Sequence, residues 1–162
     1  MHIRSATVDD LHDLVRIEQE CFPVTEAATE ESLRERLLTY SDHFWLLEIE
    51  GNVIGFIDGM VTNTPAIVDE MFEKTELHNE SGAWQAIFGV CVLRDHRKNG
   101  YAALMMERVI SDSKLQKRRG CILTCKDKLI HYYEKFGFKN YGVSKSIHGG
   151  EIWYDMRLEF QN

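Results

Sequence analysis

The chain has 162 residues, 44% of them hydrophobic, which is long and apolar enough for one domain, residues 1–162, with its own core. A formal net charge of −7 argues against nucleic acid as the main partner and mildly favours a cationic one. The sequence has neither the ~20 consecutive apolar residues of a membrane-spanning helix nor a signal peptide, which predicts a cytoplasmic protein with no membrane partner.

The cysteines and histidines do not form a metal-binding pattern. Cys21, Cys91, Cys121 and Cys125 lie mostly within apolar runs, where a free thiol packs as a small hydrophobic group. The seven histidines include no pair at zinc-site spacing. We therefore expect free cysteines and no metal site.

The N-terminal segment is predicted to form a strand followed by two helices. Residues 2–6 alternate in the manner of a strand, and Thr7 is a typical N-cap for the helix that follows. After the break at Phe22-Pro23, Thr29 is positioned to cap a second helix that ends near Tyr40.

The middle of the chain is predicted to contain a hairpin, a short helix and a buried strand. Residues 44–50 and 53–61 are strand-like and are joined by a glycine-containing turn. Asn63-Thr64-Pro65 is typical of a helix start. Residues 84–93 form an apolar run without alternation, which indicates a strand buried on both faces. Its interior glycine, Gly89, indicates a bulge or the close approach of a ligand or another backbone.

The C-terminal part is predicted to alternate between helices and strands. A basic glycine turn at residues 97–102 leads into an amphipathic helix, and a buried strand follows at residues 121–125. A helix is expected over residues 128–136, and closing strands near residues 138–145 and 151–160. This order of elements favours an α/β domain of the α+β type with a mixed sheet.

The turn between the buried strand and the amphipathic helix has the features of an anion-binding loop. A glycine turn at a helix N-terminus leaves several backbone N–H groups unpaired, and Arg94, Arg97 and Lys98 add positive charge. Glycine at position 100 lets the backbone come close to a phosphate. The alternative is a solvated basic turn with no ligand.

A second motif later in the chain supports a specific interpretation of this turn. The R-x-x-G-x-A turn resembles the pyrophosphate loop of GNAT N-acetyltransferases, and Tyr132 to Phe138, Y-Y-E-K-F-G-F, is similar to the Y-x-x-x-G-F signature of the same superfamily. Residues 122–129 resemble the arylalkylamine (serotonin) N-acetyltransferase branch, and the resemblance covers residues 77–138 well. It implies the GNAT fold, a mixed, mostly antiparallel central sheet of about seven strands flanked by helices on both faces, and acetyl-CoA as cosubstrate.

The resemblance also implies roles for individual residues. The central strand would hold the pantetheine arm of CoA through the main chain of Val90, Cys91 and Val92. The pyrophosphate would be received by the turn, which consists of Arg97, Lys98, Asn99, Gly100, Tyr101 and Ala102. Tyr133 stands where the family has a tyrosine that protonates the departing CoA thiolate, a task that suits a phenol. Without the resemblance, a core tyrosine with a satisfied hydroxyl is the simpler interpretation.

The sequence departs from the arylalkylamine branch at the residues that deprotonate the amine. That branch has two histidines on the central strand, and this chain has Ala86 and Phe88 there. Glu26 is our first candidate to meet the amine and His78 the second, although an exposed loop carboxylate is the alternative for Glu26. Phe22 and Pro23 could form an apolar wall for the acceptor or anchor the first helix.

The resulting hypothesis is an N-acetyltransferase that transfers acetyl from acetyl-CoA to a primary amine, a small arylalkylamine or polyamine-like acceptor, by direct attack in a ternary complex. We expect a monomer or homodimer. A covalent route through Cys125 is less simple, because no histidine neighbours it in a recognisable motif. Residues 17–23 also resemble the start of protein N-terminal acetyltransferases of the ribosomal-protein type. A non-catalytic acyl-CoA sensor is the alternative from another class.

Overall fold

The computed structural model describes residues 1–161, which form two compact units with one sheet each. The first unit contains residues 1–59 and 89–109. The second contains residues 60–88 and the chain from Ile110 onward. The α+β class with a mixed sheet is confirmed, but the single central sheet of about seven strands is not, because the strands divide into sheets of four and five.

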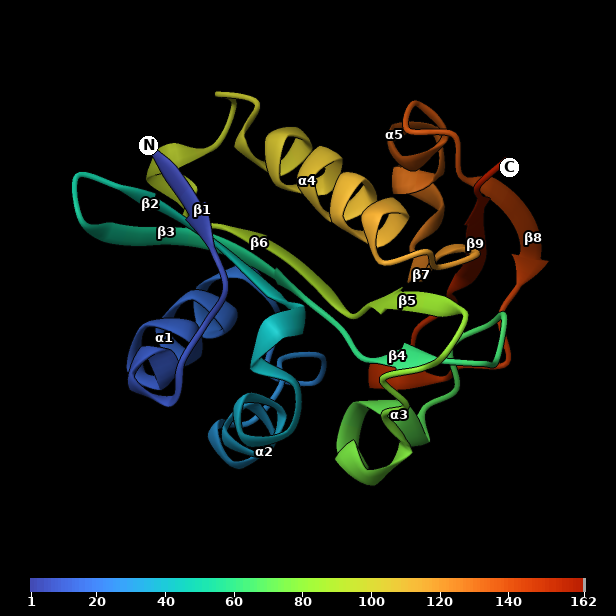
Figure 1. Ribbon diagram of the computed structural model, residues 1–162, viewed down its shortest axis with the longest axis horizontal. Helices are drawn as coiled ribbons and strands as arrows, with labels where there is room; N and C mark the ends of the chain where they lie inside the picture. The colour runs from blue at the N-terminus through green and yellow to red at the C-terminus, as the bar shows by residue number, and fades with distance from the viewer. Residues whose placement is uncertain (162) are drawn as a thin grey trace. The chain divides into compact units, whose positions relative to one another are not determined.

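The helices and strands take their labels from Figure 1. The helices are α1 (Leu11–Cys21), α2 (Glu30–Tyr40), α3 (Glu70–Glu73), α4 (Tyr101–Leu115) and α5 (Ile130–Glu134). The strands are β1 (His2–Arg4), β2 (Phe44–Ile49), β3 (Asn52–Asp58), β4 (Val61–Thr62), β5 (Trp84–Ile87), β6 (Gly89–Val92), β7 (Gly120–Cys125), β8 (Lys139–Val143) and β9 (Tyr154–Glu159). Each helix in the described residues is too short or too polar to cross a bilayer.

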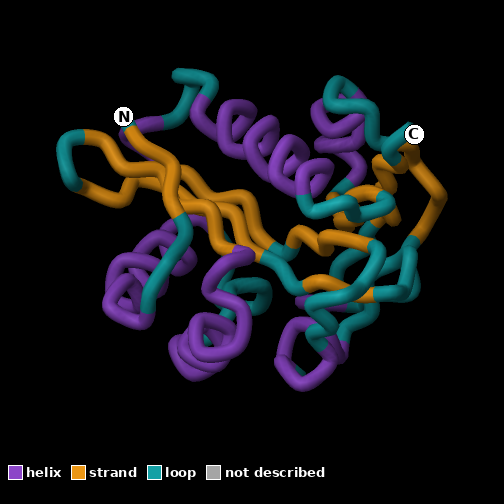
Figure 2. Tube along the Cα trace, viewed as in Figure 1, coloured by secondary structure: helices purple, strands orange, loops and turns teal. Residues whose placement is uncertain are grey.

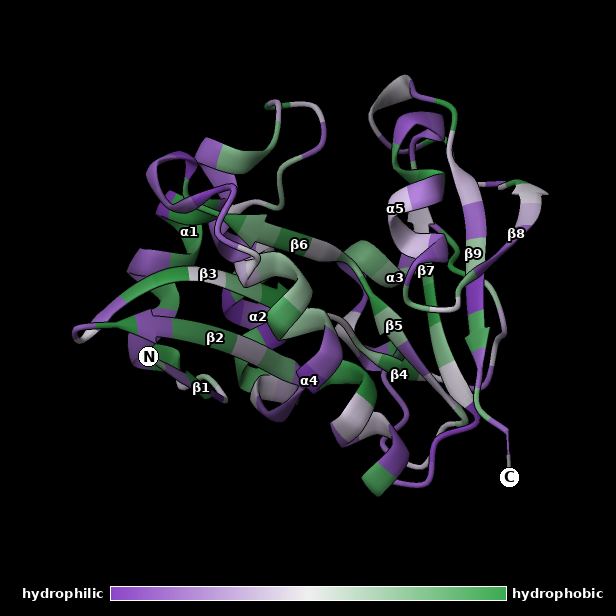
Figure 3. Cartoon of the chain, turned by 90° about the horizontal axis from the view of Figure 1, so that it is seen from above, coloured by the Kyte–Doolittle hydropathy of each residue, from purple (hydrophilic) through white to green (hydrophobic). Residues whose placement is uncertain are grey.

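The sheet of the first unit is antiparallel throughout, in the order β1-β2-β3-β6. Helices α1 and α2 cover one face, and the N-terminal part of α4 covers the other (Figures 1 and 2). The strands β2, β3 and β6 carry the hydrophobic colour in Figure 3. Phe44 and Phe56 are fully buried and stack at 6.2 Å, and burying each side chain stabilises the fold by about 1.5–3 kcal/mol.

The two predicted caps in the first unit are confirmed. Thr7 forms a capping box with Asp10 at the short 3₁₀ turn that leads into α1. Asp10 is held in place by Arg4, whose Nη2 lies 2.8 Å from Oδ1. Thr29 Oγ1 accepts the N–H of Ser32 at 3.1 Å and caps α2. Local side-chain chemistry therefore sets where both helices begin.

The sheet of the second unit is mixed, in the order β4-β5-β7-β9-β8. Strand β5 pairs with β7 in parallel, and the other pairs are antiparallel. Helix α5 packs against β8 and β9. The parallel pair brings the C-terminal ends of β5 and β7 to the same edge of the sheet.

The apolar run at residues 84–93 is two strands rather than one. It breaks at Phe88, so that β5 joins the sheet of the second unit and β6 that of the first. The atoms nearest to Gly89 belong to side chains rather than to a ligand or another backbone: a Cβ added there would lie 3.3 Å from Asp58 Oδ1 and 3.7 Å from the ring of Phe22. The first distance is tight, so a side chain at this position would need Asp58 to give by a few tenths of an ångström, whereas the second is an ordinary van der Waals contact.

The helix expected to begin at Asn63-Thr64-Pro65 was predicted too early. Helix α3 begins only at Glu70. Polar side chains of this segment instead close the loop: Asn63 Oδ1 accepts the N–H of Ala83 at 3.0 Å, and Thr62 Oγ1 accepts that of Thr64 at 3.1 Å. These bonds hold the chain in a bend.

Candidate functional site

The turn before α4 has the backbone conformation of an open anion cradle. Lys98 and Gly100 have φ angles of 66° and 77°, so two residues of the turn are left-handed. Asn99 fixes the turn, because its Nδ2 donates to the carbonyls of His96 at 3.0 Å and Arg97 at 3.3 Å. A Cβ added at Gly100 would have no atom within 4 Å, which leaves the space above the turn open to a ligand.

The amides of this turn are available to bind a ligand. Within the described residues, the N–H groups from Lys98 to Ala102 donate to no protein acceptor, and the first bonded amide is that of Leu104, which reaches Gly100 O at 3.0 Å. They lie at the N-terminus of a 15-residue helix, where the helix dipole favours negative charge. This arrangement suits an anionic group such as a phosphate.

Strand β6 leads into the turn and forms the edge of its sheet. Leu93 N donates to Ile54 O at 2.9 Å, so its main chain faces β3. Successive residues of a strand direct these groups to opposite edges, so Cys91 also faces β3, whereas Val90 and Val92 face away from it. The main chain of Val90 and Val92 is therefore directed to the edge of this sheet, where β6 pairs with no further strand of its own sheet.

The side chain of Arg97 turns back onto this edge. Its Nε donates to Val92 O at 2.9 Å, and its Nη2 lies 3.6 Å from Cys21 Sγ. The thiol of Cys21 contacts the same carbonyl at 3.4 Å. Arg97 thus links the turn to β6. The carbonyl oxygen of Val92 already accepts hydrogen bonds from Arg97 and Cys21.

Cys21 is a functional candidate that the sequence did not reveal. A hydrogen bond from Cys91 and the guanidinium of Arg97 lower the pKa of the Cys21 thiol to about 6, against the opposing effect of partial burial. The side chain is half-buried at the end of α1. The lowered pKa favours ionisation of this cysteine, which lies beside β6.

A buried ionic cluster joins α1, α2 and β3 in the same unit. Arg36 Nη1 lies 2.9 Å from Asp58 Oδ2, and both side chains are fully buried. Glu18 is the second carboxyl of the cluster, and its Oε2 accepts the N–H of Ala28 at 2.9 Å. Burial, and next the charge of Asp58, raise the pKa of Glu18 to about 7.

The loop predicted to meet the acceptor follows α1 in the first unit. Phe22 is half-buried and Pro23 is exposed. Pro23 O accepts the N–H groups of Glu26 and Ala27, both at 2.9 Å, which closes the loop into a turn. Glu26 is half-buried within this turn. Its role as the group that meets the amine stays a prediction.

Tyr133 and the two departures from the histidine pair belong to the second unit. Tyr133 is 7% exposed on α5, with its ring edge-on to Tyr132 at 5.1 Å and Phe138 at 6.0 Å. Ala86 is fully buried in β5, and Phe88 is half-buried directly after it. The predicted catalytic role of Tyr133 stays a prediction.

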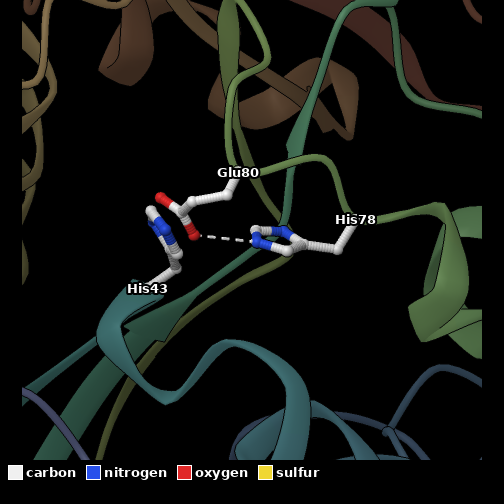
Figure 4. Close-up of side chains that lie close together, drawn as sticks. All are labelled: His43, His78 and Glu80. Atoms are coloured by element: carbon white, nitrogen blue, oxygen red, sulfur yellow. Dashed lines mark hydrogen bonds and ion pairs between the residues drawn. The ribbon is translucent and has the colours of Figure 1, made fainter.

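His78 has a structural role that occupies both of its ring nitrogens. Its Nδ1 accepts the N–H of Val61 at 3.0 Å, so Nε2 carries the proton and donates to Glu80 Oε1 at 3.0 Å, as Figure 4 shows for the second bond. A ring held in this tautomer is poorly suited to accept a proton from an amine. Cys125 is similarly unsuited as a nucleophile, because burial raises its pKa to about 11.

Comparisons with known proteins identify the family of the chain. Residues 11–138 match the Acetyltransferase (GNAT) family. Serotonin N-acetyltransferase of Mesocricetus auratus is 29% identical over 94 residues, which cover 57% of this chain and 44% of that protein. The chain thus spans less than half the length of this curated relative.

Solved structures of low sequence identity share the fold. The GphF GNAT-like decarboxylase in complex with isobutyryl-CoA has a TM-score of 0.86 at 19% identity and covers 99% of this chain and 100% of that one. The loading GNATL domain of CurA from Lyngbya majuscula has a TM-score of 0.83 at 15% identity, and the match covers 98% of this chain and 96% of that one. A GNAT family acetyltransferase of Brucella melitensis in complex with acetyl-CoA has a TM-score of 0.67 at 20% identity, and the match covers 99% of this chain and 88% of that one. On the strength of the family match, this chain belongs to the acetyltransferase (GNAT) family.

Proposed function

We propose that this protein is an acetyl-CoA-dependent N-acetyltransferase that acetylates a primary amine. The observation that carries the proposal is the run of unpaired amides from Lys98 to Ala102 at the N-terminus of α4. Their geometry suits a pyrophosphate, and the open edge of β6 beside them suits an extended pantetheine arm.

The residues of the chain divide the work of the reaction. Bound acetyl-CoA supplies the activated acetyl group. The turn amides bind the pyrophosphate, and the main chain of Val90 and Val92 orients the pantetheine arm. Tyr133 supplies a proton to the leaving sulfur, and Phe22, Pro23 and Glu26 line the path of the acceptor. Orientation and polarisation of this kind lower the barrier without a covalent enzyme intermediate.

The acceptor is proposed to be a small arylalkylamine or polyamine-like compound. The net charge of −7 favours a cationic partner, and the partial similarity to serotonin N-acetyltransferase points to an amine. A protein N-terminus of the ribosomal-protein type is the alternative acceptor. A peptide acceptor would need an open groove, whereas a small amine needs a closed pocket.

A second candidate function does not require an amine. The chain has Ala86 and Phe88 in place of the histidine pair, and the GphF structure to which it is similar is named a GNAT-like decarboxylase. Loss of carbon dioxide from a carboxyacyl-CoA needs a proton donor but no amine deprotonation, so this arrangement is compatible with it.

One experiment tests both functions. Purified protein is titrated with acetyl-CoA by calorimetry and then incubated with a panel of amines and N-terminal peptides while free thiol is followed. Malonyl-CoA is incubated separately and analysed for acetyl-CoA by mass spectrometry. We expect thiol release with at least one amine. Binding without any thiol release would refute the transferase, and conversion of malonyl-CoA would support the decarboxylase. No binding of acetyl-CoA would refute both.

A further inference from the structure

Two cysteine thiols of the first unit lie in contact where α1 packs against β6. Cys21 is the last residue of α1, and Cys91 lies within β6. The two side chains share a hydrogen bond, in which the thiol of Cys91 donates to the sulfur of Cys21. Both cysteines are free in the structure. We call Cys21 and Cys91 the thiol pair, and none of the roles above uses it as a pair.

The two thiols differ in exposure and in acidity. Cys21 is half-buried, whereas Cys91 is fully buried. The hydrogen bond from Cys91 and the guanidinium of Arg97 lower the pKa of the Cys21 thiol to about 6. Burial raises the pKa of the Cys91 thiol well above its ordinary value, so this thiol keeps its proton. A partly exposed, acidic thiol beside a protonated second thiol is the arrangement of a peroxide-reactive cysteine and its resolving partner.

A cation lies beside the exposed thiol and a carboxyl group beside the buried one. Arg97 Nη2 is 3.6 Å from Cys21 Sγ, and Glu18 Oε1 is 3.9 Å from Cys91 Sγ. Glu18 has a pKa of about 7, so it can exchange a proton near neutral pH. Asp58 on β3 adds negative charge near Glu18 and Cys91. The guanidinium is thus placed to stabilise an anion at Cys21, and Glu18 to accept the proton of Cys91.

We propose that the thiol pair is an oxidation site, at which hydrogen peroxide joins Cys21 and Cys91 in a disulfide. The thiolate of Cys21 attacks one peroxide oxygen, the O–O bond breaks, and the other oxygen leaves as hydroxide, which solvent protonates. Cys21 is then a sulfenic acid. The sulfur of Cys91 attacks the sulfur of this acid while its proton moves to Glu18. The S–O bond breaks, and the departing hydroxide takes that proton and leaves as water. The two thiols are oxidised by two electrons, and the peroxide is reduced to water.

The position of Cys21 at a helix end allows the two sulfurs to close. A disulfide has an S–S distance of about 2.05 Å, so the hydrogen-bonded sulfur atoms must approach each other. Cys91 is held in its sheet opposite Phe56 of β3. Cys21 ends α1, and Phe22 after it is extended, so a movement of Cys21 disturbs only the last turn of the helix. Because Cys21 is half-buried, a small peroxide should reach it more readily than a bulky disulfide such as oxidised glutathione.

The test uses the full chain and needs no acyl-CoA, so it does not depend on the proposed acetyltransferase function. Reduced protein is treated with hydrogen peroxide at neutral pH, with and without dimedone to trap sulfenic acid. Free thiols are then counted, and the modified peptides are identified by mass spectrometry. The variants are Cys21→Ser and Cys91→Ser, whose hydroxyl keeps a hydrogen bond but forms no disulfide. Cys125→Ala is the matched control, because it removes a buried thiol of the second unit. Melting temperature shows that each variant is folded.

We expect the parent protein to lose two of its four free thiols and to gain one disulfide between residues 21 and 91. Cys125→Ala should form the same disulfide at the parent rate. Cys91→Ser should stop at the sulfenic acid and carry dimedone on Cys21, whereas Cys21→Ser should keep its thiols. Cys21 should react at least about 10-fold faster than Cys121 and Cys125, because burial raises the pKa of those two thiols. Oxidised glutathione should form the disulfide more slowly than hydrogen peroxide does.

Retention of all four free thiols by the folded, peroxide-treated parent would overturn the inference. A cross-link that omits Cys21 or Cys91, including one between two chains, would do the same. A folded Cys91→Ser protein without dimedone on Cys21 would refute the order of the two steps. Glu18→Gln should form the sulfenic acid at the parent rate and close the disulfide more slowly, and closure at the parent rate would remove Glu18 from the proton transfer. Failure of the parent to acetylate any amine would count against the proposed function alone.

Discussion

Replacing Glu18 by glutamine should stabilise the protein above neutral pH and leave its stability unchanged in acid. The carboxyl is buried beside Asp58, and its pKa is raised from 4.5 to about 7. Protonation therefore favours the folded state. This contribution is complete below the ordinary pKa of 4.5 and is lost as the pH rises through about 7. Glutamine keeps the shape of the side chain and an oxygen for the N–H of Ala28, but it carries no charge to bury.

The size of the effect follows from the change in pKa. One pKa unit corresponds to about 1.4 kcal/mol, so ionised Glu18 costs up to about 3 kcal/mol of unfolding free energy above pH 7. In a chain of this length, that is a shift in Tm of about 6–12 °C. Thermal unfolding of both proteins at about pH 5 and about pH 8 measures it. A difference in Tm that stays the same at both pH values would refute the reasoning.

The remaining predictions concern the CoA-binding edge and the proposed reaction. Gly100→Val should weaken acetyl-CoA binding, since a branched side chain is strained at a φ of 77° and fills the open space of the turn; unchanged affinity by calorimetry would move the pyrophosphate elsewhere. Tyr133→Phe should lower kcat by about 10²-fold and leave CoA affinity nearly intact, and parent-like turnover across a pH series would remove the hydroxyl from the mechanism. The alkylation rate of Cys21 by iodoacetamide should be half-maximal near the pKa of about 6, and acetyl-CoA should protect the thiol; a midpoint near the ordinary value of 9.0 would contradict this. Glu26→Gln should raise the acceptor KM without changing CoA affinity, and unchanged kinetics would leave Glu26 a solvated loop carboxylate.

Features that depend on a few neighbouring residues could be predicted from the sequence. The starts of the first two helices were predicted, because the hydroxyl oxygens of Thr7 and Thr29 accept hydrogen bonds from amides two or three residues away. The turn at residues 97–102 was recognised for the same reason. The division of residues 84–93 between two sheets was not predictable, because the break at Phe88 depends on which distant strand each half pairs with.

Features that depend on contacts across the fold were missed. The low pKa of Cys21 requires Cys91 and Arg97, both about 70 residues or more away in sequence. Phe72, Phe88 and His148 meet only after three separate segments have packed. No short motif carries that information.

The way the chain passes between its two units has a consequence during synthesis on the ribosome. Strand β3 pairs with β6, but the chain must first make β4, α3 and β5, which belong to the other unit. Until residues 89–92 emerge, the edge of β3 has no partner in its own sheet. Such long-range pairing is slow, and an unpaired apolar edge is prone to aggregation in the meantime. The nascent protein is therefore expected to depend on chaperones until residues 89–92 have left the exit tunnel.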